Sequence, residues 1–182
     1  GLTPDLKFDF ATANNVVHMG NGTDNFATWD GTTYTEFAAL PKGNIFEVGF
    51  FRLFVAGVAA NLNRLHYSDL GAYTTFSANT DFPARITSVR SFFTRDGTES
   101  TQVFLANGDV YDVGFDSGGI YKKKARINVG AISHRSTKQI ENYNFVVDIF
   151  KNVRAVGYEE SYADLRATDR SSPVEPYIKQ AT

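Results

Sequence analysis

The stretch TQVFLANGDVYDVGF, residues 101–115, decides the fold class of this chain. It contains two alternating apolar runs joined by Asn107-Gly108, and both of these residues tolerate the positive φ angles of a tight hairpin turn. The stretch FATWDGTTYTEF, residues 26–37, repeats the pattern around Asp30-Gly31. We therefore predict two β-hairpins, each closed by a two-residue turn.

Further pairs of apolar segments extend this pattern along the chain. Residues 144–150 and 153–158 flank Lys151-Asn152, and residues 52–57 and 63–69 flank a longer loop at 58–62. Comparable strands begin near residues 16, 52, 102 and 144. Short strands repeated at such intervals predict an all-β protein of about four antiparallel sheets, arranged as propeller blades or as a sandwich.

The composition agrees with a strand-rich globular protein. The 182 residues include 16 Phe, 9 Tyr and 15 Gly, and aromatic residues with frequent glycine turns favour strands over helices. Helical composition is confined to residues 161–168 and 176–181. We expect blades over residues 1–158 and a more polar C-terminal tail, 159–182, that packs on the domain or on a neighbouring chain.

Charge and cysteine content exclude several function classes. The formal net charge of −2 provides no basic footprint for wrapping duplex DNA, and the absence of cysteine excludes a disulfide framework and a thiolate nucleophile. The longest apolar stretch, residues 53–60, is too short to span a bilayer, so no membrane insertion is expected. Because the chain opens with Gly1 and shows no signal peptide, we expect a processed or excised piece.

The motifs that suggest chemistry have simpler structural explanations. Asp-Ser-Gly-Gly at 116–119 is similar to the nucleophile loop of chymotrypsin-like proteases, but that chemistry needs a His and an Asp upstream of the serine. His134 follows the serine, and His18 and His66 lack the sequence context of that family. A glycine-rich turn between two strands explains the tetrapeptide. We expect no enzymatic activity, no cofactor and no metal site.

Two polar clusters are interpreted in the same way. The oxygen-rich residues 21–25 suit a hard cation such as calcium, but they lack EF-hand spacing, and a solvated turn is the favoured interpretation. Lys122, Lys123 and Lys124 form the only basic run. We expect an edge strand there, whose charges discourage aggregation.

The central strand at residues 52–57 supports a stacked-sheet core. Leu53 and Val55 fall on one face and Phe54 and Ala56 on the other, so both faces are apolar, and Gly57 lets the chain turn away. Arg52 and Arg64 either pair with Asp69 or Glu47 or are solvated charges at the strand ends, and the sequence favours neither alternative. The predicted buried residues are Leu53, Phe54, Val55, Leu65, Val103, Phe104, Val146 and Val147.

Residues 41–76 carry the most informative motif, PKGNIFEVGFFRLFVAGVAANLNRLHYSDLGAYTTF. An Arg-Leu-Phe-x-Ala-Gly strand is followed by a short loop and then by Arg-Leu-x-Tyr-Ser-Asp. This resembles the blade signature of β-propeller proteins in bacteriophage tails, of the portal-proximal hub, nozzle or packaged-DNA stabilisation type. Residues 130–136 and 173–178 resemble later parts of the same pattern. The signature residues are Trp29, Asp30, Gly31, Arg52, Leu53, Phe54, Gly57, Arg64, Leu65, Tyr67, Ser68 and Asp69.

The resemblance implies a non-enzymatic structural protein of the virion, a phage-tail hub, nozzle or connector near the DNA channel. Its partners would be other tail or portal-proximal proteins in a homo-oligomeric ring, with passive contact to DNA in transit. It would reside in the virion, and in the host cytoplasm during assembly. The loop at 58–62 lacks the family's proline, and the chain is short for a closed propeller. We therefore expect a fragment of a longer propeller, a propeller completed by another chain, or a partial propeller whose sheets do not close.

A second function stays open from the sequence. Exposed aromatic residues on a propeller or sandwich could recognise a glycan on a receptor or cell surface. The candidate residues for such recognition are Trp29, Tyr34, Tyr67 and Tyr73.

Overall fold

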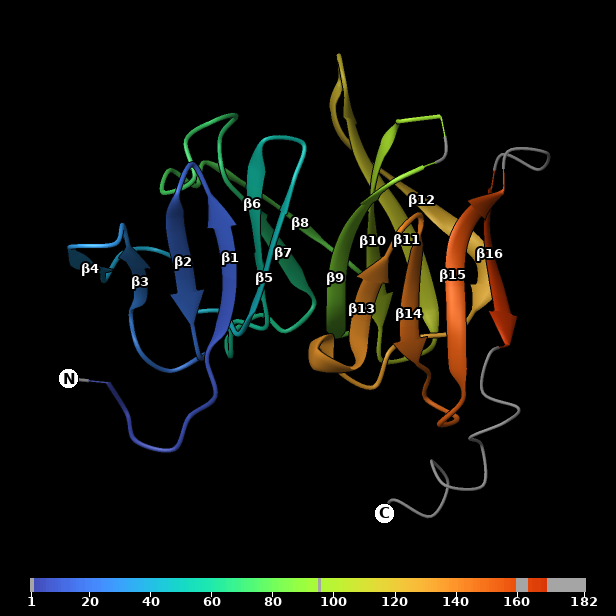
Figure 1. The fold of residues 1–182 in the computed structure, drawn as a ribbon, viewed down its shortest axis with the longest axis horizontal. Coiled ribbons are helices and arrows are strands. Elements are labelled where there is room, and N and C mark those ends of the chain that lie inside the picture. The colour runs from blue at the N-terminus through green and yellow to red at the C-terminus, as the bar shows by residue number, and fades with distance from the viewer. Residues whose placement is uncertain (1, 95, 160–163, 170–182) are drawn as a thin grey trace. The chain divides into compact units, whose positions relative to one another are not determined.

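The chain forms sixteen strands in four antiparallel sheets of four strands each (Figure 1). The computed structural model describes residues 2–94, 96–159 and 164–169. Each sheet is a meander in which the strands pair in chain order. The prediction of an all-β fold with about four antiparallel sheets is confirmed.

The strand bounds are as follows. The first sheet contains β1 (Asp9–Ala13), β2 (Val16–Gly20), β3 (Phe26–Trp29) and β4 (Tyr34–Phe37). The second contains β5 (Ile45–Gly49), β6 (Arg52–Ala56), β7 (Arg64–Tyr67) and β8 (Ala78–Asp81). The third contains β9 (Ile86–Phe93), β10 (Glu99–Leu105), β11 (Asp109–Asp116) and β12 (Gly119–Asn128). A 3₁₀ turn (His134–Ser136) precedes the fourth, which contains β13 (Thr137–Ile140), β14 (Tyr143–Val147), β15 (Val153–Glu159) and β16 (Asp164–Asp169).

The sequence repeat corresponds to a structural repeat. The strands expected near residues 16, 52, 102 and 144 are β2, β6, β10 and β14, each the second strand of its sheet. A second strand has a hydrogen-bonded neighbour on both sides, and in β6 and β10 it also carries a continuous buried run, from Leu53 to Ala56 in β6. This position explains why these strands were the easiest to recognise.

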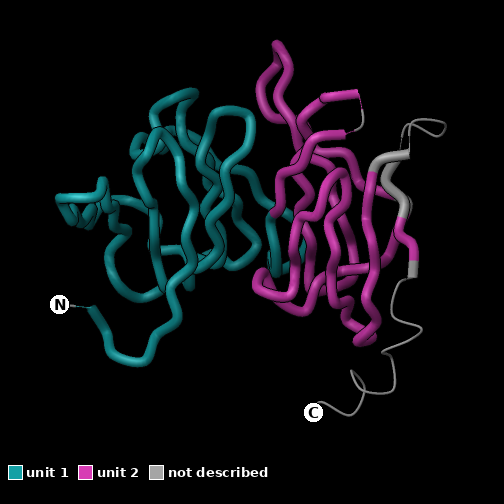
Figure 2. The backbone as a smooth tube through the Cα atoms, viewed as in Figure 1, with its two compact units in different colours: residues 1–89 teal, residues 90–182 magenta. Residues whose placement is uncertain are grey.

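Two compact units divide the chain, residues 1–89 and 90–182 (Figure 2). In unit 1 the core is built around Phe26, which packs against Phe46 at a ring-centroid distance of 5.5 Å and edge-on against Phe37 and Phe76. In unit 2 the core joins Phe92 and Phe104 to Val146 and Val156. Each unit therefore has an apolar centre of its own.

The buried core was predicted with one exception. Leu53, Phe54, Val55, Leu65, Val103, Phe104 and Val146 have no exposed surface. Val147 is only half-buried, because successive residues of β14 face opposite sides and burial alternates along the strand.

The C-terminal region differs from its prediction. The helix expected over residues 161–168 is wrong, because residues 164–169 form β16. This strand pairs with β15 from Glu159↔Asp164 to Arg154↔Asp169, so the fourth sheet extends past the expected blade boundary at residue 158 into the expected tail. The helix expected over residues 176–181 and the motif at 173–178 lie outside the described residues.

The two-residue turns predicted for the hairpins are wrong. The β10–β11 loop contains three residues, 106–108, and only Gly108 among them has a positive φ, of 93°. The β3–β4 loop contains four residues, 30–33, because the Asp30 carboxylate Oδ1 accepts the backbone N–H groups of Thr32 and Thr33 at 2.8 and 2.7 Å. The tetrapeptide at 116–119 is a turn between β11 and β12, as its structural interpretation expected.

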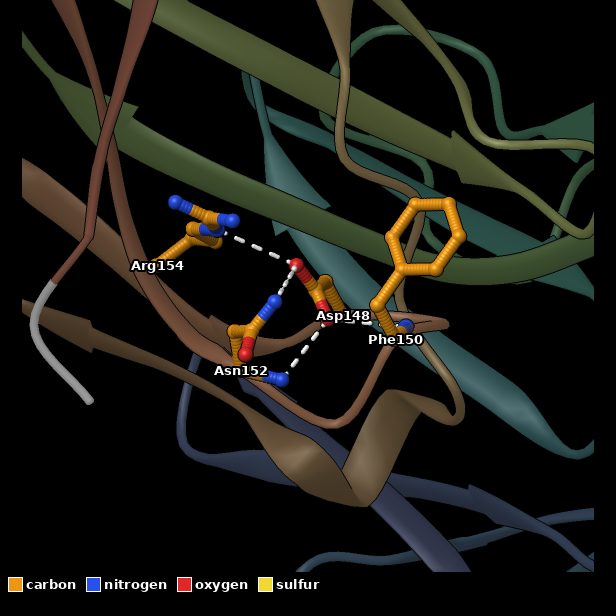
Figure 3. A network of polar contacts seen from close by, with 4 residues as sticks. All are labelled: Asp148, Phe150, Asn152 and Arg154. Carbon is orange, nitrogen blue, oxygen red and sulfur yellow. Dashed lines mark hydrogen bonds and ion pairs between the residues drawn. The ribbon is translucent and has the colours of Figure 1, made fainter. Parts of the chain in front are cut away.

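A buried aspartate shapes the β14–β15 hairpin (Figure 3). Asp148 is 1% exposed, and its Oδ1 accepts the backbone N–H groups of Phe150 and Asn152, each at 2.8 Å. Its Oδ2 lies 3.1 Å from Nε of Arg154. The carboxylate thus accepts hydrogen bonds from two backbone N–H groups and one guanidinium that would otherwise need water. Because of these bonds the loop contains five residues, 148–152, and not only the expected Lys151-Asn152 turn.

Replacing Asp148 by alanine should lower the free energy of unfolding by roughly 2–4 kcal/mol, since it leaves charged and backbone donors unpaired at a buried site. Urea unfolding followed by fluorescence measures the loss. Asp148→Asn keeps one acceptor for the turn and should cost less. Equal costs for the two variants would contradict the role of the two-oxygen carboxylate.

Truncation of Phe54 to alanine should lower the free energy of unfolding by roughly 3–5 kcal/mol, because this β6 side chain is fully buried. Phe93→Ala is the matched control, since that ring is 55% exposed and its loss should cost less than about 1 kcal/mol. Urea denaturation of the full chain gives both values. A small loss at Phe54 would show that β6 does not form the core.

Candidate functional site

The signature residues of the second sheet are joined by a compact hydrogen-bond network at Ser68. The N–H of Ser68 donates to the carbonyl of Leu53 at 2.9 Å, and the Ser68 hydroxyl accepts the N–H of Leu53 at 2.9 Å. Nη1 of Arg52 donates to the Ser68 carbonyl at 2.6 Å, while the guanidinium lies 6.0 Å from the ring centroid of Tyr67. Ser68 therefore fixes the point at which the chain leaves β7.

The ion pair of Arg64 differs from the one considered from the sequence. Arg64 forms a two-pronged pair with Asp81 of β8, at 2.7 and 2.9 Å, rather than with Asp69 or Glu47. The pair is solvent-exposed, so it contributes little to stability. The Asp69 carboxylate accepts the hydroxyl of Ser77 instead, and its N–H donates to the carbonyl of Thr75 at 2.8 Å, which closes the loop after β7.

The remaining signature residues divide between core and surface. Leu53, Phe54 and Leu65 are fully buried, and Gly57 has φ +72° with its Cα against the Asn44 side chain, so it turns the chain as expected. Trp29 and Tyr34 face each other across β3 and β4, and they are 39% and 40% exposed. Asp30 and Gly31 lie in the loop between them.

An apolar surface patch at the end of the second sheet was not foreseen. β5 and β6 are joined by the two-residue turn Phe50-Phe51, in which both residues have φ +52°. Phe51 is 74% exposed and Leu70 is 67% exposed, and the N–H of Gly71 donates to the carbonyl of Phe51 at 2.8 Å. We call these two exposed side chains the Phe51–Leu70 patch.

The sequence gives no turn signal at this position. A tight turn with two positive φ angles normally takes Asn-Gly, whereas phenylalanine is a strand former and is strained in this conformation. The available clue was the pair of flanking polar or small residues, Gly49 and Arg52, at the ends of two apolar runs. Strain of this kind in a bulky residue concentrates at functional sites.

A cavity with both polar and apolar lining lies next to the loop after β7. Its volume is about 360 Å³. The first sheet and its turns line it with Ala13, Asn14, Val16, His18, Thr28, Asp30, Thr33 and Thr35, and the loop after β7 lines it with residues 71–74. The β1–β2 turn, the β5–β6 turn and the loop after β7 lie at one end of unit 1, at the top in Figure 1. We call this cavity the His18 pocket.

His18 is the buried polar group of this pocket. It is 3% exposed, and its ring packs against Phe26 and Tyr73 at centroid distances of 6.0 and 5.7 Å. Within the described part of the chain, neither ring nitrogen has a hydrogen-bond partner. Burial lowers the pKa of His18. The Ala13 backbone acts in the opposite direction and raises the pKa by a smaller amount, although its geometry does not meet the criteria for a hydrogen bond. The imidazole is therefore neutral at pH 7.

Asp30 supplies the negative charge of the pocket. Hydrogen bonds from Thr33 and Thr32 hold the pKa of its carboxyl below the ordinary value, so the group is ionised at neutral pH. Within the described residues, Oδ1 of this carboxylate accepts hydrogen bonds from the Thr32 N–H, the Thr32 hydroxyl and the Thr33 N–H. Oδ2 is the oxygen that a ligand could approach.

Other sequence candidates are parts of turns and edges. Asn21 Oδ1 accepts the N–H groups of Thr23 and Asp24 at 2.9 and 2.8 Å, and Thr3 donates to the Asp24 carboxylate, as expected for a turn. The run 122–124 is exposed on β12, an edge strand of the third sheet, and Lys124 pairs with Asp109 at 2.7 Å. Within the described ranges, no three His, Asp or Glu side chains gather as metal ligands, and no helix has the length and apolarity to cross a membrane.

Comparison with known proteins supports the fold class. A structure titled "YCF48 bound to D1 peptide" matches with a TM-score of 0.52 and 12% identity over 100% of this chain and 57% of that chain. BBS1N in complex with ARL6DN matches with a TM-score of 0.51 and 10% identity over 91% and 51%. The chain has a β-propeller type of fold. It spans about half the length of these solved chains. No family model and no curated protein matches the sequence.

Mild acid should destabilise the protein through its buried histidines. Burial lowers the pKa of His18, and burial with the nearby Arg64 lowers that of His66, below 6.5. Just below pH 6.5 the unfolded chain therefore binds more protons than the folded chain, so the free energy of unfolding falls from about pH 7 toward pH 5. The lowered carboxyl pKa of Asp30 acts only at more acidic pH.

Urea unfolding at several pH values measures this dependence. The double variant His18→Phe with His66→Gln cannot take up these protons and should show a flatter profile between about pH 7 and 5. An unchanged slope in the double variant would assign the acid sensitivity to other groups.

Proposed function

We propose that this chain is a non-enzymatic, protein-binding β-propeller component of a phage tail, a hub, nozzle or connector near the DNA channel. The titles of the two solved propellers name a bound partner in each case, ARL6DN for BBS1N and D1 peptide for YCF48. Those partners support binding of protein as a use of this fold. The phage-tail setting is supported by the motifs at residues 52–57 and 64–69.

The observation that carries the proposal is the Phe51–Leu70 patch. A bulky residue at positive φ costs about 1–2 kcal/mol, and two such residues follow each other in the β5–β6 turn. Phe51 recovers little of this cost by burial, because it is 74% exposed. A contact that buries its ring in a partner would supply the missing apolar gain, and aromatic side chains dominate such contacts.

The partner surface is an apolar pocket on a neighbouring virion protein or on the next copy in a ring. A ring uses head-to-tail interfaces, in which a projecting side chain on one copy meets a recess on the next. In this arrangement the protein acts in the virion, and in the host cytoplasm while the tail assembles. DNA in transit would meet it passively, since the net charge is −2.

The use of the carboxylates supports a role without chemistry. Asp30, Asp96, Asp116 and Asp148 each accept a backbone N–H group of their own turn. Carboxylates used in this way stabilise loops, whereas acid–base catalysis needs a pair of carboxyl groups whose pKa values are driven apart within a shared cleft.

Phe51→Gly tests the proposal. Relief of the positive-φ strain, about 1–2 kcal/mol, exceeds the extra backbone entropy of glycine, about 0.5–1 kcal/mol, so the chain should be as stable as the parent or slightly more stable. Assembly should nevertheless be lost. Light scattering measures the oligomer of the full chain, and mass spectrometry measures its copies in purified particles.

Phe93→Ser is the matched control, because it removes an exposed phenylalanine outside the patch. It should leave assembly intact. Particles that incorporate the Phe51→Gly chain at the parent level would reject the patch as the contact surface. A stable monomer with no counterpart in any virion would reject the tail role itself.

A further inference from the structure

The His18 pocket has the construction of a small-molecule site that is separate from the Phe51–Leu70 patch. Its volume of about 360 Å³ lies at the small end of the range for ligand pockets, about 300–1,000 Å³. Strands of the first sheet supply Ala13, Val16, His18, Thr28 and Thr35, and turns and the loop after β7 supply the remaining lining residues. Phe51 and Leu70 are not among the lining residues.

The buried imidazole points to an occupant. Polar atoms at 3% exposure normally have hydrogen-bond partners, and both His18 nitrogens lack one within the described part of the chain. Phe26 and Tyr73 pack against the ring and offer no alternative acceptor at its faces. An apolar side chain of similar shape would fill the same position without the free-energy cost of two unpaired buried nitrogens. We therefore infer that the nitrogens bond to a ligand.

The lining chemistry selects the class of ligand. A neutral imidazole has one donor and one acceptor nitrogen, and Thr28, Thr35 and Tyr73 add hydroxyl groups that both donate and accept. Asp30 adds an ionised acceptor, and no lysine or arginine lines the cavity. These groups suit a neutral ligand with several hydroxyls, and they disfavour phosphates, carboxylates and purely apolar molecules.

The exposed aromatic pair at the base of the β3–β4 loop lies outside this site. Trp29 and Tyr34 pair across β3 and β4, and they are 39% and 40% exposed. They neighbour Thr28 and Thr35, which line the pocket, and successive residues of a strand face opposite sides of the sheet. Within the pocket, Tyr73 supplies an aromatic ring for the apolar C–H face of a sugar.

We propose that the His18 pocket binds one unit of a neutral saccharide, with His18 and Asp30 hydrogen-bonded to its hydroxyl groups and Tyr73 against its ring. This site lies beside the protein-binding patch and shares no lining residue with it, so the same molecule holds a tail partner and a neutral glycan at neighbouring positions.

The experiment uses the full chain with methyl glycosides of glucose, galactose, mannose, rhamnose and N-acetylglucosamine, at concentrations up to about 10 mM, which detects millimolar binding. Saturation-transfer NMR detects binding, and titration gives the dissociation constant. Methyl glucuronide and inorganic phosphate serve as anionic probes. We expect at least one neutral glycoside to bind and the anionic probes to bind more weakly or not at all.

Two variants test the named residues. His18→Phe keeps the aromatic packing, should leave the melting temperature unchanged or higher, and should weaken binding by about tenfold or more. Asp30→Asn keeps an oxygen for the loop, removes the charge, and should weaken binding by a smaller factor. If His18→Phe fails to fold, Asp30→Asn and Tyr73→Ala carry the test.

The Phe51→Gly chain separates this proposal from the proposed function. It should bind the glycoside as the parent does while it loses assembly, and His18→Phe should assemble normally. Absence of binding by every neutral glycoside would overturn the saccharide site. Unchanged affinity in the folded His18→Phe and Asp30→Asn variants, or stronger binding of the anionic probes, would overturn it as well.

Discussion

The double link between Leu53 and Ser68 is the constraint on which the candidate surface of unit 1 depends. Leu53 is fully buried in the most apolar strand of the second sheet, so its backbone position is set by the core. Ser68 uses both its backbone and its hydroxyl to bond to that backbone, and its carbonyl accepts from Arg52. The loop after β7 therefore starts from a fixed point.

The loop after β7 contacts both the β5–β6 turn and the His18 pocket, so its position affects both. Gly71 donates to the carbonyl of Phe51 and supports the strained β5–β6 turn, while Tyr73, two residues on, covers His18. Strain and an unsatisfied buried nitrogen both lower stability, and both lie against the loop after β7. A rigid pair of sheets tolerates such costs, which is why binding sites are common on the loops of propellers.

The hairpins show how far local sequence signals extend. The pairs of strands around Asp30-Gly31 and Asn107-Gly108 form as predicted, because alternation of apolar residues specifies pairing. The loop lengths do not follow from the dipeptides, since Asp30 and Asp148 reach forward to bond two N–H groups each and enclose additional residues. The side-chain acceptor prevails over a tight backbone turn both at the exposed Asp30 and at the buried Asp148.

The sequence by itself determined the fold class, the repeat of four second strands and nearly all of the core. These features depend on patterns of two to eight neighbouring residues, and burial on both faces of β6 is visible from its composition. The helix expected over residues 161–168 failed because pairing with β15 overrode local helical composition. The Phe51–Leu70 patch and the His18 pocket were decided only by the tertiary structure. Their residues come from strands and loops far apart in sequence, and nothing local in the chain states that a phenylalanine will be held at positive φ or that a histidine will be buried without a partner.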